Sequence, residues 1–310
     1  MTGRDADRSA GLWLLSCSAS MGAMLCSRFG WLPALLGGGL GAVGFHLRMR
    51  GGEVPTAVRL LQTLWLAVPL SVAAKGATAL FPAGGPSLYV PAVVLGLGWL
   101  LCCHERSGVL ACCAVAGFFV LTALGIVALC SLADLHPAWL RPEFSWVQLL
   151  SALAVGSGGM LLAEAAPATR PGPGWRCAAA LAPAVLSALA AGGLSRPQAA
   201  RQASAFYALS RAVSLLGVAE RFEALIAACL TLGACSACTL LLRAACGGNR
   251  TRALLASVAL ILVRSPLPEL PAAAGTVLLW GIIPAIFSKN RGKSHNRKKL
   301  KKKKKVLDKF

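Results

Sequence analysis

The feature that most constrains this chain is a series of long apolar stretches separated by short polar loops. A helix needs about 20 mainly apolar residues to cross the hydrocarbon core of a bilayer. Ten stretches approach or exceed this length, at 11–27, 31–47, 57–81, 88–103, 108–133, 146–166, 177–194, 217–242, 252–268 and 271–288. We therefore expect an all-α polytopic membrane protein with about ten transmembrane helices.

The composition argues against a soluble or disordered chain. Of the 310 residues, 56% are hydrophobic and only 14% are charged, whereas ordinary soluble proteins contain about 25% charged residues. A soluble domain of this length needs far more polar surface than these residues can cover. A chain this apolar also differs from intrinsically disordered proteins, which have few hydrophobic residues.

The net charge of +20 is concentrated at the end of the chain. Residues 289–310 contain 12 Lys and Arg against one acid, Asp308. A lysine run can bind nucleic acid, but this run directly follows an apolar stretch, which favours a cytoplasmic tail held near anionic lipid headgroups. We expect residues 1–288 to form a transmembrane domain and residues 289–310 a disordered polybasic tail, with the lipid bilayer as a partner and no nucleic acid.

The charges of the short loops predict the orientation. With a cytoplasmic N-terminus, the inner loops and adjoining helix ends hold eleven arginines apart from the tail, and the outer side holds seven. Basic residues favour the cytoplasmic side, so we expect a multi-pass protein with both termini in the cytoplasm. Four outer arginines fall in or just beyond the connection 195–216. This connection is either an interfacial amphipathic helix or a plain extracellular loop.

Residue types that carry catalytic or metal chemistry form no recognisable pattern. Cys235 and Cys238 have the CxxC spacing, but no companion histidine or second pair lies nearby, so they are interpreted as small buried apolar residues. The four histidines form no HxxxH or HExxH motif, and GxSxG, P-loop and paired catalytic carboxylates are absent from the sequence. We therefore expect no enzyme activity, no catalytic residues, no metal and no cofactor.

Ionisable residues within membrane stretches are rare and mark functional sites. Lys75 lies late in the third stretch and Glu164 late in the sixth. Each is either part of such a site or snorkels to the nearer interface, the outer one for Lys75 and the inner one for Glu164. Glu220 and Glu223 open the eighth stretch, and we expect them at the outer rim with Arg221 offsetting their charge.

Two stretches are rich in glycine and serine. Transporters bind solutes where helices unwind near the bilayer midplane, because the unwound backbone offers free N–H and C=O groups. The first and sixth stretches are five apart, which is the spacing of an inverted five-plus-five repeat. The alternative is ordinary close packing of helices through small residues. The candidate solute-binding residues are Ser18, Ser20, Gly22, Ser157, Gly158 and Met160.

Four segments carry a resemblance to a known family. They are HERSG at 104–108 in an inner loop, DLHPAWLRP at 134–142 in an outer loop, GVAERFEA at 217–224 where the eighth stretch begins, and Ile283-Pro284 before the lysine tail. Together with the ten-span count, these segments resemble the B subunit of bacterial spore germinant receptors. That permease-like family is a branch of the amino acid–polyamine–organocation transporter superfamily.

The resemblance implies a LeuT-like five-plus-five inverted repeat in the bacterial inner or spore inner membrane. It implies a permease-like subunit that acts as a sensor or permease for a small amino-acid-like solute together with other germinant-receptor subunits. Unwound turns at 18–23 and 156–160 would contact the amino and carboxylate groups of that solute. Two alternatives stay open: a secondary amino-acid transporter without a signalling role, and a non-transporting structural or assembly membrane protein.

Overall fold

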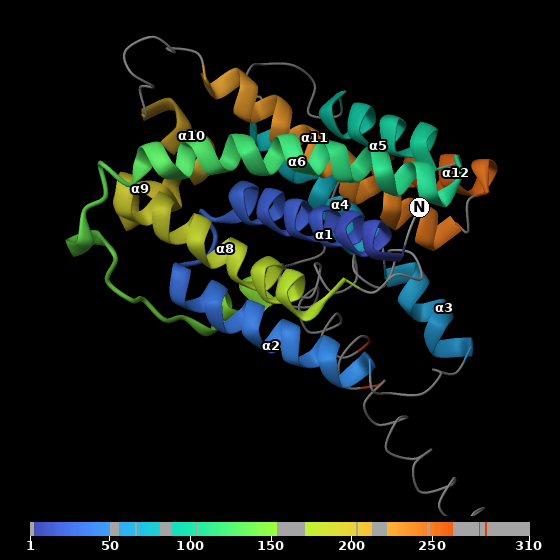
Figure 1. Ribbon diagram of the computed structural model, residues 1–310, viewed down its shortest axis with the longest axis horizontal. Helices are drawn as coiled ribbons and strands as arrows, with labels where there is room; N and C mark the ends of the chain where they lie inside the picture. Colours follow the sequence, from blue (N-terminus) through green and yellow to red (C-terminus); the bar gives the residue numbers. More distant parts are fainter. Residues whose placement is uncertain are drawn as a thin grey trace, which may run out of the picture.

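The computed structural model describes residues 3–49, 56–65, 67–80, 89–102, 104–153, 171–202, 204–212, 222–246 and 249–262, together with Leu279 and Ile283. Across these residues the regular secondary structure is helical and includes no strand, which confirms the expected all-α class (Figure 1). The polybasic tail 289–310 lies outside the described residues.

The labelled helices follow the apolar stretches of the sequence closely. Residues 146–153, at the start of the sixth stretch, are helical as well. The elements are α1 (Gly3–Leu25), α2 (Trp31–Met49), α3 (Thr56–Trp65), α4 (Ala67–Gly76), η1 (Ala77–Leu80), α5 (Tyr89–Cys102), α6 (Arg106–Ser131), η2 (Pro137–Trp139), α8 (Pro173–Leu194), α9 (Arg196–Arg201), α10 (Ala205–Ala212), α11 (Phe222–Cys246) and α12 (Arg250–Leu262).

Three of the described helices are long and apolar enough to cross a membrane. They cover Ser107–Ser131, Pro173–Leu194 and Glu223–Cys246, and shorter apolar helices occur at Trp31–Val43, Leu60–Ala74 and Tyr89–Cys102. These three helices agree with the expected membrane protein. The helix α1 is 23 residues long but is not among the three, because Arg4, Asp5, Asp7, Arg8 and several serines lower its hydropathy.

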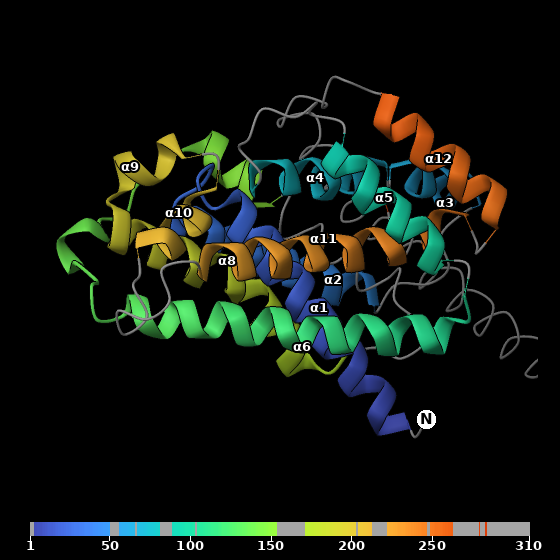
Figure 2. The ribbon, with the colours of Figure 1, turned by 90° about the horizontal axis from the view of Figure 1, so that it is seen from above.

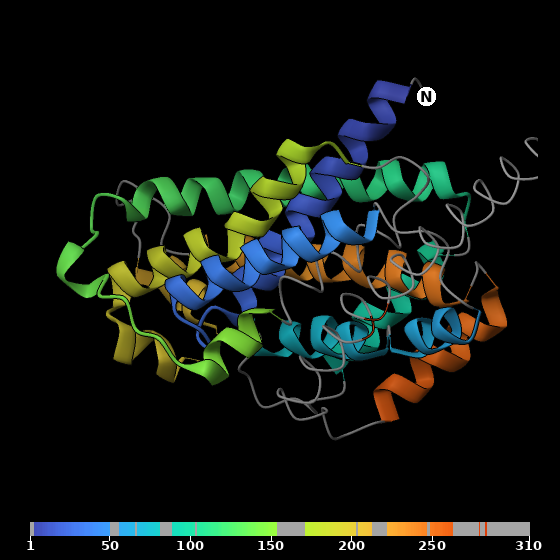
Figure 3. The same cartoon turned by 90° about the horizontal axis from the view of Figure 1, so that it is seen from below.

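The helices form an elongated bundle in which α1, α8 and α11 lie between two flanks. The helix α6 forms one flank, and α3, α4, α5 and α12 form the other (Figures 2 and 3). The helix α1 packs against α8, α6 and α11, and α2 packs against α8 on the side away from α11 (Figure 3). Chain direction alternates along the sequence: α1, α6 and α8 run from right to left in Figure 1, and α2 and α11 run back.

These helix bounds bear on two of the expected segments. In the third stretch, expected as one span at 57–81, α3 covers Thr56–Trp65 and α4 covers Ala67–Gly76, with residue 66 outside the described residues, and the 3-10 turn η1 follows. The connection 195–216 contains α9 and α10, and α10 packs against α8, α11 and α1. Phe206 and Leu209 of α10 are buried, so α10 is part of the bundle rather than a plain extracellular loop.

Candidate functional site

The helix α1 is enclosed by its neighbours along most of its length. Between Ala10 and Ser27 every residue is buried except Leu12, Leu15 and Met21, which are partly exposed. This segment contains the serines and the glycine that the sequence singled out, so the candidate solute residues of the first stretch lie at the centre of the bundle.

The unwound turn expected at 18–23 is not found, because α1 is α-helical without interruption from Gly3 to Leu25. Its hydroxyl groups are satisfied without unwinding. Ser16 Oγ donates to the carbonyl of Trp13 at 2.9 Å, and Ser20 Oγ donates to the carbonyl of Ser16 at 2.7 Å. Such bonds to the preceding turn let serine sit inside a helix that is surrounded by other helices.

Ser18 makes the one described side-chain hydrogen bond from α1 to the middle of α8. Pro183 lies inside α8, and proline has no backbone N–H, so the carbonyl four residues earlier loses its helical partner. That carbonyl belongs to Ala179, and Ser18 Oγ donates to it at 2.5 Å. The serine of one helix therefore satisfies the group that the proline of the other helix leaves free.

Small residues allow the other close approaches of α1. A β-carbon on Gly22 would lie 2.8 Å from the Cα of Pro183, and a β-carbon on Gly117 of α6 would lie 2.6 Å from Ser16 Oγ. On α11, a β-carbon on Gly233 would overlap the hydroxyl of Ser20. Such close approach is typical of helix pairs in membranes. There, small residues let the helices come close enough for van der Waals packing to drive their association.

The structure places the predicted site residues in two groups. Ser18, Ser20 and Gly22 lie in α1 and face α8 and α11 as packing residues, and their role as solute contacts stays a prediction. Lys75 falls in the last turn of α4. The residues Ser157, Gly158, Met160, Glu164 and Glu220 lie outside the described residues.

Glu223 lies in the first turn of α11 and forms an ion pair with α10. Its carboxylate is 2.7 Å from Nε of Arg211. The side chain of Glu223 is 33% exposed and that of Arg211 is 59% exposed. The expected partner, Arg221, lies outside the described residues. The pair joins the start of α11 to the short helix that precedes it.

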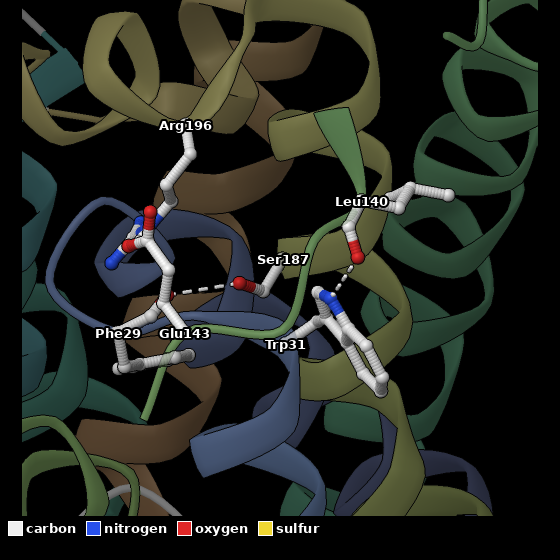
Figure 4. Close-up of polar contacts among 6 residues, drawn as sticks. All are labelled: Phe29, Trp31, Leu140, Glu143, Ser187 and Arg196. Carbon is white, nitrogen blue, oxygen red and sulfur yellow. Dashed lines mark hydrogen bonds and ion pairs between the residues drawn. The ribbon is translucent and has the colours of Figure 1, made fainter. Parts of the chain in front are cut away.

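A polar network missed by the sequence analysis lies at the left end of the bundle in Figure 1. Figure 4 shows its contacts: Trp31 Nε1 donates to the carbonyl of Leu140 at 3.1 Å, and Ser187 Oγ donates to the carbonyl of Phe29 at 2.9 Å. Arg196 Nε lies 3.7 Å from the carboxylate of Glu143. The loop between α6 and residue 146 thus fastens the start of α2 and the start of α9.

Backbone geometry helps to position Arg196. Ser195, at the junction of α8 and α9, has φ 63° and ψ 150°, a backbone conformation that non-glycine residues rarely adopt. The turn directs Arg196 back toward the bundle, where only 12% of its side chain is exposed. The sequence gives only a weak indication of this turn, namely an Arg-Pro pair that follows shortly after two glycines.

Side-chain hydrogen bonds join α5 to α11 and to α12 at the opposite end of the bundle. Arg243 of α11 donates from Nη1 to the carbonyls of Cys102 and His104, at the end of α5. Trp99 Nε1 of α5 donates to the carbonyl of Arg250, the first residue of α12, at 3.1 Å. A cation near helix-terminal carbonyls is favourable, so this end of α5 is well satisfied.

The thiols and acidic groups of the described residues form no metal centre. The eleven described cysteines are free thiols. Among the described residues no group of three or more His, Cys, Asp or Glu side chains is arranged to hold a metal ion. Comparison with known proteins adds no assignment: no family model and no curated protein matches the chain.

Proposed function

We propose that this chain is the permease-like membrane subunit of a spore germinant receptor and that it senses a small amino-acid-like solute. The proposal includes ten transmembrane helices with both termini in the cytoplasm, and a five-plus-five inverted repeat. Its sequence support is the resemblance of the segments 104–108, 134–142 and 217–224. Its structural support is the way the described helices pair.

The observation that carries the proposal is contact between helices that are five apart in the expected order. Counted by the apolar stretches, α2 is second and α8 seventh, α4 third and α11 eighth, α5 fourth and α12 ninth. Each of these three pairs is in contact. An inverted repeat relates such helices by a pseudo-two-fold axis, and helices near the axis lie against their own counterparts.

Contacts within each half support the same symmetry. The helix α4 contacts α5, and their counterparts α11 and α12 contact each other. A contact between the two halves follows the same pattern. Gln62 Nε2 of α3 donates to the carbonyl of Leu279 at 2.9 Å, which joins the third stretch to the tenth. The repeat relates the third stretch to the eighth and the tenth to the fifth. The corresponding contact is therefore that between α11 and α6, which is also present.

The continuous α1 changes the proposed site. It supplies a helical wall rather than an unwound turn, so the proposed solute contacts in the interior come chiefly from Ser157, Gly158 and Met160 of the sixth stretch. Binding shifts the equilibrium between two arrangements of the bundle. The seam between α1 and α8, with few polar contacts and small residues, is suited to such a shift.

Binding and uptake measurements on the full chain in liposomes test the proposal. We expect saturable binding of at least one of the twenty common L-amino acids, without accumulation of the bound amino acid inside the liposomes. The substitution Gly158→Leu should lower this binding at least tenfold. The matched control is Gly125→Leu in α6, where a β-carbon would meet nothing within 4 Å.

Each other result has a defined meaning. Accumulation driven by a proton or sodium gradient would replace sensing by secondary transport. No binding of any amino acid would contradict both and leave a structural or assembly role. A tag at residue 310 that is accessible from outside intact cells would contradict the proposed topology.

A further inference from the structure

The polar network at the left end of the bundle contains an acceptor that has no donor. Gln148 Oε1, in the helical segment 146–153, is buried and accepts no hydrogen bond from the described residues. Leaving a buried acceptor unpaired costs about 1–3 kcal/mol. A native protein retains such a group chiefly where a ligand, ion or ordered water supplies the missing donor.

The loop that precedes Gln148 also supplies one partner of an ion pair. Glu143 and Arg196 face each other at 3.7 Å (Figure 4), which is longer than the 2.7–2.9 Å of a strong charge-assisted hydrogen bond. Arg196 is 12% exposed and Glu143 58% exposed. A guanidinium that is largely removed from water and only loosely paired retains several N–H donors for an anion.

Gly30 lies beside both the acceptor of Gln148 and the backbone of Glu143. A β-carbon built on Gly30 would lie 3.7 Å from Gln148 Oε1 and 3.7 Å from the carbonyl oxygen of Glu143. The room at Gly30 is that of one methyl group in ordinary van der Waals contact with these two oxygens and with Cδ of Pro33. This room borders the turn after α1, where Ser187 holds the carbonyl of Phe29.

We propose that Arg196, Glu143 and Gln148 form a binding site for the zwitterionic head of a free α-amino acid. The proposal rests on the proposed function and adds to it a second site, at the left end of the bundle in Figure 1. Arg196 binds the carboxylate of the ligand. Gln148 Oε1 and the Glu143 carboxylate accept hydrogen bonds from its ammonium group.

The charges of the ligand and of the site match one for one. A zwitterion that enters between Glu143 and Arg196 replaces one long ion pair with two closer ones, and it gives Gln148 the donor that it lacks. A simple carboxylic acid or a simple amine satisfies only half of the site. The site therefore selects ligands that carry both groups on one carbon.

The experiment uses the full chain in liposomes and the amino acid of the common twenty that binds most tightly. Its methyl ester lacks the carboxylate charge, and its N-acetyl derivative lacks the ammonium group. We expect Arg196→Met to lower affinity for the amino acid at least tenfold and to leave affinity for the methyl ester unchanged. We expect Gln148→Leu to lower affinity for the amino acid about tenfold and to leave affinity for the N-acetyl derivative unchanged.

Matched variants on the same side of the bundle control for folding and surface charge. Arg201→Met and Gln202→Leu change exposed residues of the α9 segment and should bind all three compounds like the unmodified chain. Loss of affinity for all three compounds in Arg196→Met would indicate structural damage and overturn the assigned role, because a recognition residue discriminates among them.

The outcomes separate this site from the proposed function. If the unmodified chain binds an amino acid and the Arg196→Met and Gln148→Leu variants bind it equally well, the site is wrong and the proposed function stands. If the unmodified chain binds none of the twenty, the proposed function fails and the site fails with it. Affinity changes that follow the charged group removed from the ligand would support the site.

Discussion

The helices α1 and α6 run in the same direction and touch where Gly117 meets Ser16, yet they occupy opposite environments. On α6, Val115, Phe118 and Phe119 are each more than half exposed. On α1, no large hydrophobic side chain between Ala10 and Leu25 is exposed. One helix presents apolar groups outward, and the other is surrounded by protein.

The difference shows that the hydropathy of a helix in such a bundle depends on what surrounds the helix. A helix that faces lipid must be apolar, because lipid offers its polar groups no partner. A helix inside the bundle can carry hydroxyl groups, because neighbouring helices and its own backbone supply partners. The helix α6 is therefore recognised as a span by composition, whereas α1, which has more neighbours, is not.

The strongest test of the comparison is a larger residue at the contact between α1 and α11. Gly233→Val places side-chain atoms where Ser20 Oγ lies, and overpacking of this kind costs about 3 kcal/mol. We expect that loss in the free energy of unfolding, measured by titration with dodecyl sulfate in mixed micelles. On α6, a β-carbon on Gly125 would meet nothing within 4 Å, and Gly125→Val should change the free energy of unfolding by no more than about 0.5 kcal/mol.

A double substitution checks the mechanism of this effect. The milder Gly233→Ala should destabilise the chain, and adding Ser20→Gly should restore much of the loss, because the overlapping hydroxyl is removed. Strictly additive effects of the two substitutions would mean that the two residues do not meet in the way described.

The second largest effect concerns the hydrogen bond between α1 and α8. Ser18→Ala leaves the carbonyl of Ala179 without a donor, which costs about 1–2 kcal/mol for a buried acceptor. In a Pro183→Ala background the new backbone N–H of residue 183 can bond that carbonyl. The same Ser18→Ala substitution should then cost less than half as much.

The counterpart on α6 is Thr122, which is exposed and donates to the carbonyl of Phe118 at 2.9 Å. That carbonyl keeps its helical partner, so Thr122→Ala should change the unfolding free energy by less than about 0.5 kcal/mol. Equal costs for Ser18→Ala and Thr122→Ala would contradict the special role of the proline in α8.

A smaller effect is expected at the rim, where polar contacts are reached by water. The ion pair of Arg211 and Glu223 is partly exposed, and exposed ion pairs contribute about 0.2–1 kcal/mol. Arg211→Gln should lower stability by about 0.5 kcal/mol at low ionic strength, and the difference should disappear near 0.5 M salt. A loss that is independent of salt would point to packing rather than charge.

The smallest effect is expected on the exposed side of α6. Phe118 is 58% exposed, so Phe118→Leu exchanges one apolar group for another in contact with lipid or detergent. The unfolding free energy should change by less than about 0.3 kcal/mol. A loss above 1 kcal/mol would indicate that this surface is covered by another protein chain.

Helix positions could be predicted because they depend on local composition. The fifth stretch was expected at 108–133, and α6 covers Arg106–Ser131. The start of α8 was expected at residue 177 but lies at Pro173. Trp175 and Arg176 lower the local hydropathy, so the sequence placed the start of the helix after them. Proline at the first helical position favours helix initiation, and the helix therefore begins earlier.

The state of the first helix could not be predicted from its residues alone. Serine and glycine favour unwinding and favour close packing equally well, and the choice depends on what lies opposite. For Ser18 the deciding partner is Ala179, which is 161 residues away in sequence. The pair of Glu143 and Arg196 likewise joins a loop and a turn that no local pattern connects.

The bond between Ser18 and Ala179 has a consequence for the order of biosynthesis. The segment of α1 leaves the ribosome early, whereas its proline-containing partner follows some 160 residues later. Until α8 is made, the less apolar first helix lacks the neighbour that encloses it, and in the proposed membrane protein α8 would enter the bilayer with a carbonyl whose donor is Ser18 of α1. We expect the N-terminal helix to depend on a temporary partner in the insertion machinery, and to leave it only when the seventh stretch has been inserted.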